Sequence, residues 1–176
     1  MTSEARTHLF RIRRHLVVAA AVLVATACIL ASTPAHAQQV VVHDPEGDAE
    51  FYDIATVTVQ HRTERVRFKI HAYDRTPYGY HVKIDTPGGK PWKYVVLWAA
   101  YTPHKVWVQN RKQYRSGSGS RCQLRTAGEP TTRDVTFSVP VRCFKKPNRL
   151  RAKAKGWDDE AGFTDHTRWT GWARRG

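Results

Sequence analysis

The feature of this sequence that most constrains its fold is the alternation of apolar and polar side chains in many short segments. In the clearest segment Val66, Phe68 and Ile70 occupy every second position, and basic residues stand between them. Side chains of a β-strand point alternately to opposite faces, so such a segment has one buried and one solvated face. No long segment after residue 37 shows a sustained helical period. The pattern predicts an all-β protein.

Segments of this kind recur about eight times, with turn residues between them. They cover residues 55–60, 65–72, 80–85, 94–101, 105–109, 121–125, 135–141 and 150–155. Short strands at such spacings are typical of antiparallel sandwiches and small barrels. Segment 94–101 is apolar on both faces, so we expect a central strand that is covered from both sides. We predict one antiparallel β-sandwich over residues 38–176.

The first 37 residues do not share this pattern. Arg13 and Arg14 precede an apolar run at residues 16–31, and residues 35–37 read Ala-His-Ala. A basic start, an apolar centre and a small-x-small ending are typical of a cleavable export signal, here cleaved after Ala37. The apolar run of about 16 residues is shorter than a membrane-spanning helix, so we expect no transmembrane segment after cleavage. General secretion is the default hypothesis, and the arginine pair leaves the twin-arginine route open.

Cleavage of the export signal also sets the length and the net charge of the exported protein. Removing 37 of the 176 residues leaves 139, which suits one domain with one core. The removed segment holds four of the 29 basic and one of the 15 acidic residues, so the net charge falls from +14 to +11. For a secreted, extracellular protein this charge favours a cell-wall polymer or another acidic polysaccharide over intracellular nucleic acid. A basic surface without a dedicated partner explains the charge equally well.

The cysteines agree with export. Cys28 leaves with the export signal, so Cys122 and Cys143 remain. Two cysteines in an exported domain most simply form one disulfide, and both share the phase of their inward-facing neighbours. The bridge closes a loop of about 20 residues, which stabilises the fold by roughly 3 kcal/mol in the chain-entropy model.

Acidic residues gather in two places, with five in residues 44–53 and four in residues 158–165. Carboxylates at two-residue spacing around a glycine turn can converge on a hard cation such as Ca²⁺. The hypothesised calcium ligands are Asp44, Asp48, Asp53, Asp158 and Asp159. Two other interpretations stay open: these acids build the turn before a strand, or they pair with the abundant arginines.

Three blocks of the sequence carry a resemblance. They are residues 44–48 with Asp53-Ile54, residues 80–86, and residues 168–176. Together they resemble small secreted actinobacterial β-sandwich proteins of no settled function. The aspartate-rich opening is also similar to that of DOMON-like carbohydrate-binding sandwiches, in which such a segment can hold calcium. The sequence departs from the DOMON-like pattern because no second acid directly follows Asp48.

Aromatic and basic residues suggest a contact surface. Trp107 has the opposite phase to Val106 and Val108, so we expect its indole to face outward. Indole faces stack on sugar rings, and beside basic residues they also stack nucleobases. The predicted ligand contacts are Trp92, Trp107, Arg65, Arg67 and Lys69. The first hypothesis for function is a non-catalytic module that binds a glycan or an anionic cell-surface polymer.

An enzyme is the alternative hypothesis. The chain contains no HExxH, no GxSxG and no glycine-rich phosphate-binding loop. A hydrolase would have to use a carboxylate pair drawn from Asp44–Asp53 and Asp158–Asp165. A third hypothesis is an exported structural protein with no dedicated ligand. The sequence leaves the ligand, the export route and the oligomeric state open.

Overall fold

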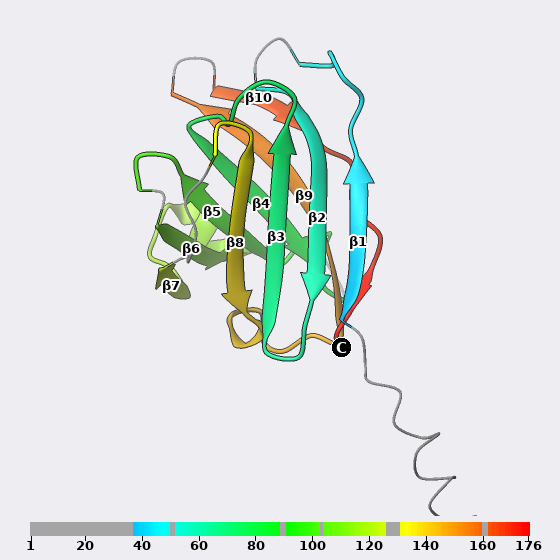
Figure 1. The fold of residues 1–176 in the computed structure, drawn as a ribbon. Coiled ribbons are helices and arrows are strands. Elements are labelled where there is room, and N and C mark those ends of the chain that lie inside the picture. Colours follow the sequence, from blue (N-terminus) through cyan, green and yellow to red (C-terminus); the bar gives the residue numbers. More distant parts are fainter. Residues whose placement is uncertain (1–36, 50–51, 89–90, 103, 126–130, 160–161) are drawn as a thin grey trace, which may run out of the picture. The chain divides into compact units, whose positions relative to one another are not determined.

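The alternating segments form antiparallel strands in the computed structural model, which describes residues 37–49, 52–88, 91–102, 104–125, 131–159 and 162–176. Residues 1–36 of the hypothesised export signal lie outside the described residues, as do Glu50 and Glu160 of the two acidic groups. The described residues form eleven strands, one α-helix and one 3₁₀ helix. None of these helices is long and apolar enough to cross a membrane. The strands form two antiparallel sheets that pack on each other, which confirms the predicted sandwich (Figure 1).

The first sheet has the strand order β1-β2-β3-β8. Its strands are β1 (Gln38–His43), β2 (Ile54–His61), β3 (Arg65–Ala72) and β8 (Asp134–Pro140). The register places Phe68 between Val59 and Phe137, so these three apolar side chains lie side by side on the inner face. The polar residues between them form the solvated outer face, as the alternation requires.

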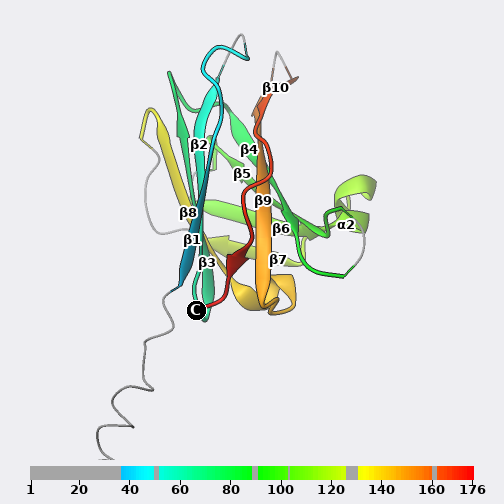
Figure 2. The ribbon, with the colours of Figure 1, turned by 90° about the vertical axis from the view of Figure 1, so that its right-hand side faces the viewer.

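The second sheet has the order β10-β9-β4-β5-β6-β7. Its strands are β4 (Gly79–Asp85), β5 (Tyr94–Ala99), β6 (Lys105–Asn110), β7 (Cys122–Arg125), β9 (Arg149–Asp158) and β10 (Gly162–His166). A short strand, β11 (Ala173–Arg174), pairs with the first two residues of β9. Figure 2 shows the two sheets as separate layers.

The core fills the space between the two sheets. The rings of Phe68 and Phe137 lie 5.3 Å apart in the first sheet, and those of Tyr80 and Trp98 lie 5.9 Å apart in the second. These residues are at most 3% exposed. Burial of each large apolar side chain contributes about 1.5–3 kcal/mol to folding. The face of each strand that carries these side chains therefore turns toward the other sheet.

The single α-helix of the described chain, α2 (Arg111–Ser116), directly follows β6. It begins with a capping box, in which the side chains of Asn110 and Gln113 each accept a hydrogen bond from the other residue's N–H, both at 3.0 Å. It lies on the side of the second sheet that faces away from the first (Figure 2). α2 contacts β5, and the outward-facing Val95 is fully buried. This agrees with the predicted covering from both sides for most of β5, but Leu97 is half-buried, and Ala100 and Tyr101 lie exposed beyond the end of the strand.

The predicted disulfide joins Cys122 of β7 to Cys143, with their Cα atoms 6.0 Å apart. Cys143 is buried as expected, but it does not continue the preceding strand. β8 ends at Pro140, and the 3₁₀ helix η1 (Val141–Phe144) follows. The bridge thereby ties the four-residue strand β7 to the turn after β8.

The eight predicted strands correspond to β2 through β9. Strands β1, β10 and β11 were not predicted, and neither was α2. The segment of β1 reads Gln-Gln-Val-Val-Val-His and does not alternate, while β10 and β11 lie in the C-terminal tail. All three additional strands pair with strands that the alternation does predict.

Candidate functional site

Three aspartates from distant parts of the chain meet at one place. Asp44 directly follows β1, Asp48 lies in the turn after it, and Asp165 belongs to β10. One carboxylate oxygen of each residue lies within 4.8 Å of those of the other two. Asp44 and Asp165 are buried, and Asp48 is exposed. We call these three residues the carboxylate cluster.

Backbone N–H groups hold the segment around the cluster in place. Gly47 has a φ of 81°, which glycine adopts without strain, and its N–H donates to Asp53 Oδ2 at 2.6 Å. The N–H of Ile54 donates to Asp165 Oδ2 at 2.7 Å. The first residue of β2 in the first sheet is thereby tied to β10 of the second.

Burial and mutual repulsion make the cluster unfavourable when it is ionised. Burial, followed by the charges of Asp165 and Asp48, raises the pKa of Asp44 to about 6. Burial also raises the pKa of Asp165, although N–H groups of Ile54 and His166 oppose this. Asp44 is 5% exposed, and its Oδ2 has no hydrogen-bond partner among the described residues. An unsatisfied buried oxygen costs about 1–3 kcal/mol, so the cluster is suited to a bound cation.

The cluster contains only part of the predicted calcium set. Asp44 and Asp48 belong to it, and Asp53 lies beside it as the acceptor for Gly47. The third member, Asp165, was not among the predicted calcium ligands. In the sequence, Asp165 could be noticed only as a member of the second acidic group. The pairing of β10 with β9 is what brings its carboxylate to the end of β1.

Asp158 and Asp159 do not belong to the carboxylate cluster. Asp158 is buried and accepts a hydrogen bond from the Tyr52 side chain, and Asp159 is exposed. The hydrolase hypothesis needs carboxylates from both acidic groups to meet, and Asp44 and Asp165 do so. The surface hollows described below are lined by other residues, so this pair has no substrate cleft among them.

The outer face of the second sheet presents two neighbouring rows of side chains, each formed by residues that are paired across strands. The His81 row consists of Lys155, His81, Leu97, Trp107 and Gln123. The Lys83 row consists of Lys153, Lys83, Val95 and Gln109. Two residues along a strand span about 7 Å, and this is the spacing between the rows.

Positive charge concentrates in the Lys83 row. Lys83 and Lys153 stand directly opposite each other in β4 and β9, an arrangement that destabilises a sheet. Burial, followed by the charges of Lys155, Lys153 and Arg111, lowers the pKa of Lys83. The one carboxylate at the outward positions of β4 to β7 and β9 is Asp85, which pairs with Arg151 at 2.9 Å.

Trp92 joins this charge to an aromatic surface. Lys83 Nζ lies 5.3 Å from the centre of the Trp92 ring, and the Arg111 guanidinium lies 5.2 Å from it. Tyr114 of α2 contacts the same ring edge-on at 5.8 Å, and its hydroxyl lies 2.9 Å from His81 Nδ1. The predicted contact residue Trp92 thus contacts two basic residues, Lys83 and Arg111, which were not among the predicted ligand contacts.

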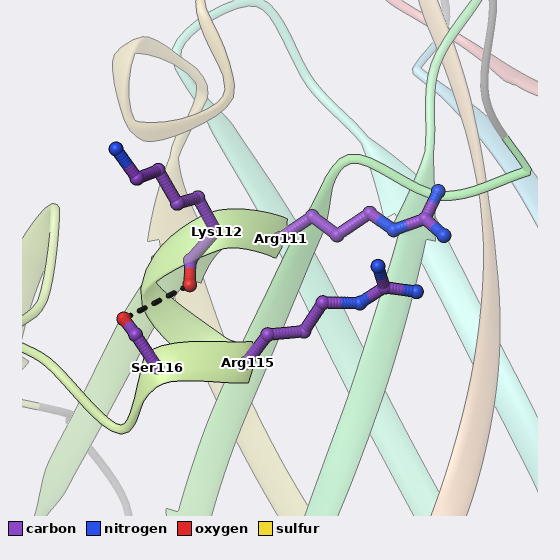
Figure 3. A pocket seen from close by; sticks show the side chains of 4 residues that line it. All are labelled: Arg111, Lys112, Arg115 and Ser116. Atoms are coloured by element: carbon purple, nitrogen blue, oxygen red, sulfur yellow. Dashed lines mark hydrogen bonds between the residues drawn. The ribbon is translucent and has the colours of Figure 1, made fainter.

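Helix α2 adds a second arginine. The side chains of Arg111 and Arg115 extend to the same side of the helix, and Lys112 points the other way (Figure 3). The Ser116 hydroxyl donates to the Lys112 carbonyl at 3.0 Å. These four residues line a surface hollow of about 780 Å³, and none of the four is acidic.

The structure separates the other predicted contacts into two groups. Trp107 is half-buried on the outer face of the second sheet, as its phase predicts. Arg65, Arg67 and Lys69 belong to β3 and face outward from the first sheet, on the opposite side of the sandwich. Lys69 Nζ also pairs with Asp134 at 3.1 Å. One ligand surface therefore does not include both groups.

Comparison with known proteins adds no functional information. No protein-family model, no curated protein and no solved structure matches this chain. The resemblances to actinobacterial and DOMON-like sandwiches therefore stay predictions. Function has to be inferred from the carboxylate cluster and from the basic surface around Lys83 and Trp92.

Proposed function

We propose that the protein is a secreted, non-catalytic binding module for an acidic polymer, which lies along the Lys83 row. The observation that supports this most strongly is the direct opposition of Lys83 and Lys153, with Arg111 over the same Trp92 ring as Lys83. These cations repel one another in the free protein, and a bound polyanion replaces that repulsion with attraction.

The chemistry of the surface suits a chain of anionic groups. Arg111 and Arg115 have planar guanidinium groups, and each guanidinium can donate two parallel hydrogen bonds to one carboxylate or sulfate. The lysines act as point charges, and one cation of each kind, Lys83 and Arg111, lies over the Trp92 ring. The positive groups come from β4, β9 and α2, so the surface has an extent that a single small anion would not fill.

Binding of polygalacturonate to residues 38–176, measured across a salt series, tests this function. We expect affinity to fall steeply with salt, because cations that contact a polyanion release its counterions. The double variant Lys83→Gln/Lys153→Gln should weaken binding and reduce the slope of log K against log salt by about 2.

The matched control is Arg67→Gln/Lys69→Gln, which removes the same charge from the opposite face of the sandwich. It should leave most of the affinity intact. Equal weakening by the two double variants would show that net charge alone attracts the polymer, and no measurable binding would reject the function.

The secretion part of the proposal has its own test. Expression of the full chain in a bacterial host with both export routes should place the protein in the medium. The N-terminal sequence of the released protein should begin at Gln38. Retention of the first 37 residues would contradict the proposal.

We also propose that the carboxylate cluster binds Ca²⁺. The supporting observation is the buried Asp44 Oδ2, which lacks a hydrogen-bond partner among the described residues, next to the carboxylates of Asp48 and Asp165. Oxygen ligands of this charge suit a hard cation that tolerates irregular geometry, which favours Ca²⁺ over Mg²⁺.

The melting temperature in millimolar Ca²⁺ and in chelator tests this site, because a ligand that binds only the folded state stabilises it. Asp48→Asn should abolish the difference, and Asp48 is exposed, so its replacement should leave the fold intact. Asp159→Asn, at an exposed carboxylate outside the cluster, is the control. Identical melting temperatures with and without Ca²⁺ would reject the site.

A further inference from the structure

A second hollow lies beside the Lys83 row. It has a volume of about 450 Å³. Its lining residues include His81, Leu97, Trp107, Gln109, Ser120 and Trp157. We call it the aromatic hollow. Tyr101 is 68% exposed at its edge, while Trp107 and Trp157 are half-buried.

The strand register explains why aromatic side chains gather here. Leu97 lies between His81 and Trp107 in the His81 row, so these three side chains form a continuous surface. Trp157 of β9 pairs with Gly79, and its ring stacks on His81 at 6.4 Å with 17° between the planes. A Cβ atom at Gly79 would lie 2.6 Å from the Trp98 carbonyl oxygen and 3.2 Å from the Trp157 ring, so a side chain here would clash with β5 and press on the indole.

Polar groups stand where the hollow meets the basic surface. Gln109 belongs to the Lys83 row and also lines the hollow, and its Nε2 donates to the Gly119 carbonyl at 2.7 Å. Ser120 follows on the same wall. His81 connects the two surfaces through its 2.9 Å contact with Tyr114, which packs on Trp92.

Resting on the proposed function, we infer that the acidic polymer is a polysaccharide and that the aromatic hollow binds one of its sugar rings. Aromatic faces carry partial negative charge, so they attract the C–H groups on the flat side of a sugar. Hydroxyl groups at the ring edge would meet Gln109 and Ser120. The next acidic group along the chain reaches the Lys83 row about 7 Å away.

The ligand therefore needs both a sugar ring and a negative charge. A polyphosphate supplies the charge without a ring that can stack, and a neutral oligosaccharide supplies rings without charge. Nucleic acid has both flat rings and charge. The lining also holds the aliphatic Leu97 and the polar side chains of Gln109 and Ser120, which suit the C–H and hydroxyl groups of a sugar better than a nucleobase.

Calorimetry with residues 38–176 tests the inference with four probes: hexagalacturonate, a neutral hexasaccharide, inorganic polyphosphate and single-stranded oligothymidylate. Trp107→Ala should lower the affinity for hexagalacturonate by about tenfold and leave polyphosphate binding unchanged, because only the sugar stacks on the indole. Lys83→Gln/Lys153→Gln should lower the affinity for both. Trp107 faces outward, so its removal leaves the core intact.

Trp172→Ala is the matched control, because this half-buried indole packs against Arg149 and Arg151 and does not line the hollow. Equal losses in the two tryptophan variants would overturn the sugar subsite and leave the polymer-binding function standing. A larger loss for oligothymidylate than for hexagalacturonate in Trp107→Ala would assign the hollow to a nucleobase instead. Failure of every anionic probe to bind would reject the proposed function itself.

Discussion

The carboxyl group of Asp44 is buried close to two other carboxylates, so its ionisation changes the free energy of folding. Its pKa is about 6 in the folded protein, above the ordinary value of 3.8. Between these values the folded state binds more protons than the unfolded chain, so stability falls as the pH rises. Above both values, the ionised form costs about 2–3 kcal/mol of folding free energy.

We predict that in chelator the free energy of unfolding is about 1.5 kcal/mol higher at pH 5 than at pH 7.5 through this residue. Asp44→Asn should remove that part of the pH dependence and stabilise the protein at pH 7.5. Urea unfolding at the two pH values measures both effects. Asp159→Asn is the control, and a pH dependence that survives unchanged in Asp44→Asn would contradict the prediction.

At the scale of elements, the disulfide holds the short strand β7. This strand has four residues, and in the described chain it pairs only with β6. Because the two cysteines are separated by 21 positions, their bridge should stabilise the fold by about 3 kcal/mol. The variant Cys122→Ala/Cys143→Ala should lose this amount in urea unfolding, and reductant should then have no further effect on it. A loss below about 1 kcal/mol would show that packing alone holds β7.

Helix α2 positions Arg111, Arg115 and Tyr114, so its cap should influence binding. Asn110→Ala removes one half of the capping box and should cost about 1 kcal/mol of stability. Because the arginines then lose their fixed placement, we also expect weaker binding of polygalacturonate. Ser118→Ala, in the loop after the helix, is the control. Unchanged affinity in Asn110→Ala would show that α2 does not position the ligand contacts.

The same elements show what the sequence can and cannot predict. Alternation identifies β3 and its two faces, because burial on one side leaves a period of two in the residues themselves. Helix α2 has six residues, too few for a helical period to emerge. Alternation also shows that Lys83 and Lys153 face outward without showing that they stand opposite each other. That pairing depends on a register between strands separated by about 70 residues, and turn geometry fixes register only within hairpins.

At the scale of the whole molecule, contacts outside the core also connect the two sheets. Near the carboxylate cluster, Asp165 of β10 accepts the Ile54 N–H of β2. Elsewhere the C-terminal tail reaches both sheets. Ala173 pairs with Leu150 of β9, and its carbonyl lies 3.2 Å from Nδ1 of the buried His61 in β2. The tail therefore closes the space between β9 and the first sheet.

Deletion of residues 172–176 should destabilise the fold by about 3–5 kcal/mol, because several hydrogen bonds and the burial of Ala173 are lost together. The lost bonds include those from the Arg174 N–H to Gln38 and from the Gly176 N–H to the His61 carbonyl, at 2.9 and 3.1 Å. Thermal unfolding and amide exchange measure the effect, and the amides of β1, β2 and β9 should lose protection first. Arg174→Ala/Arg175→Ala keeps these backbone donors and should cost less than about 1 kcal/mol. If the substituted and the shortened chains lost equal stability, side-chain charge rather than the backbone of the tail would hold the two sheets together.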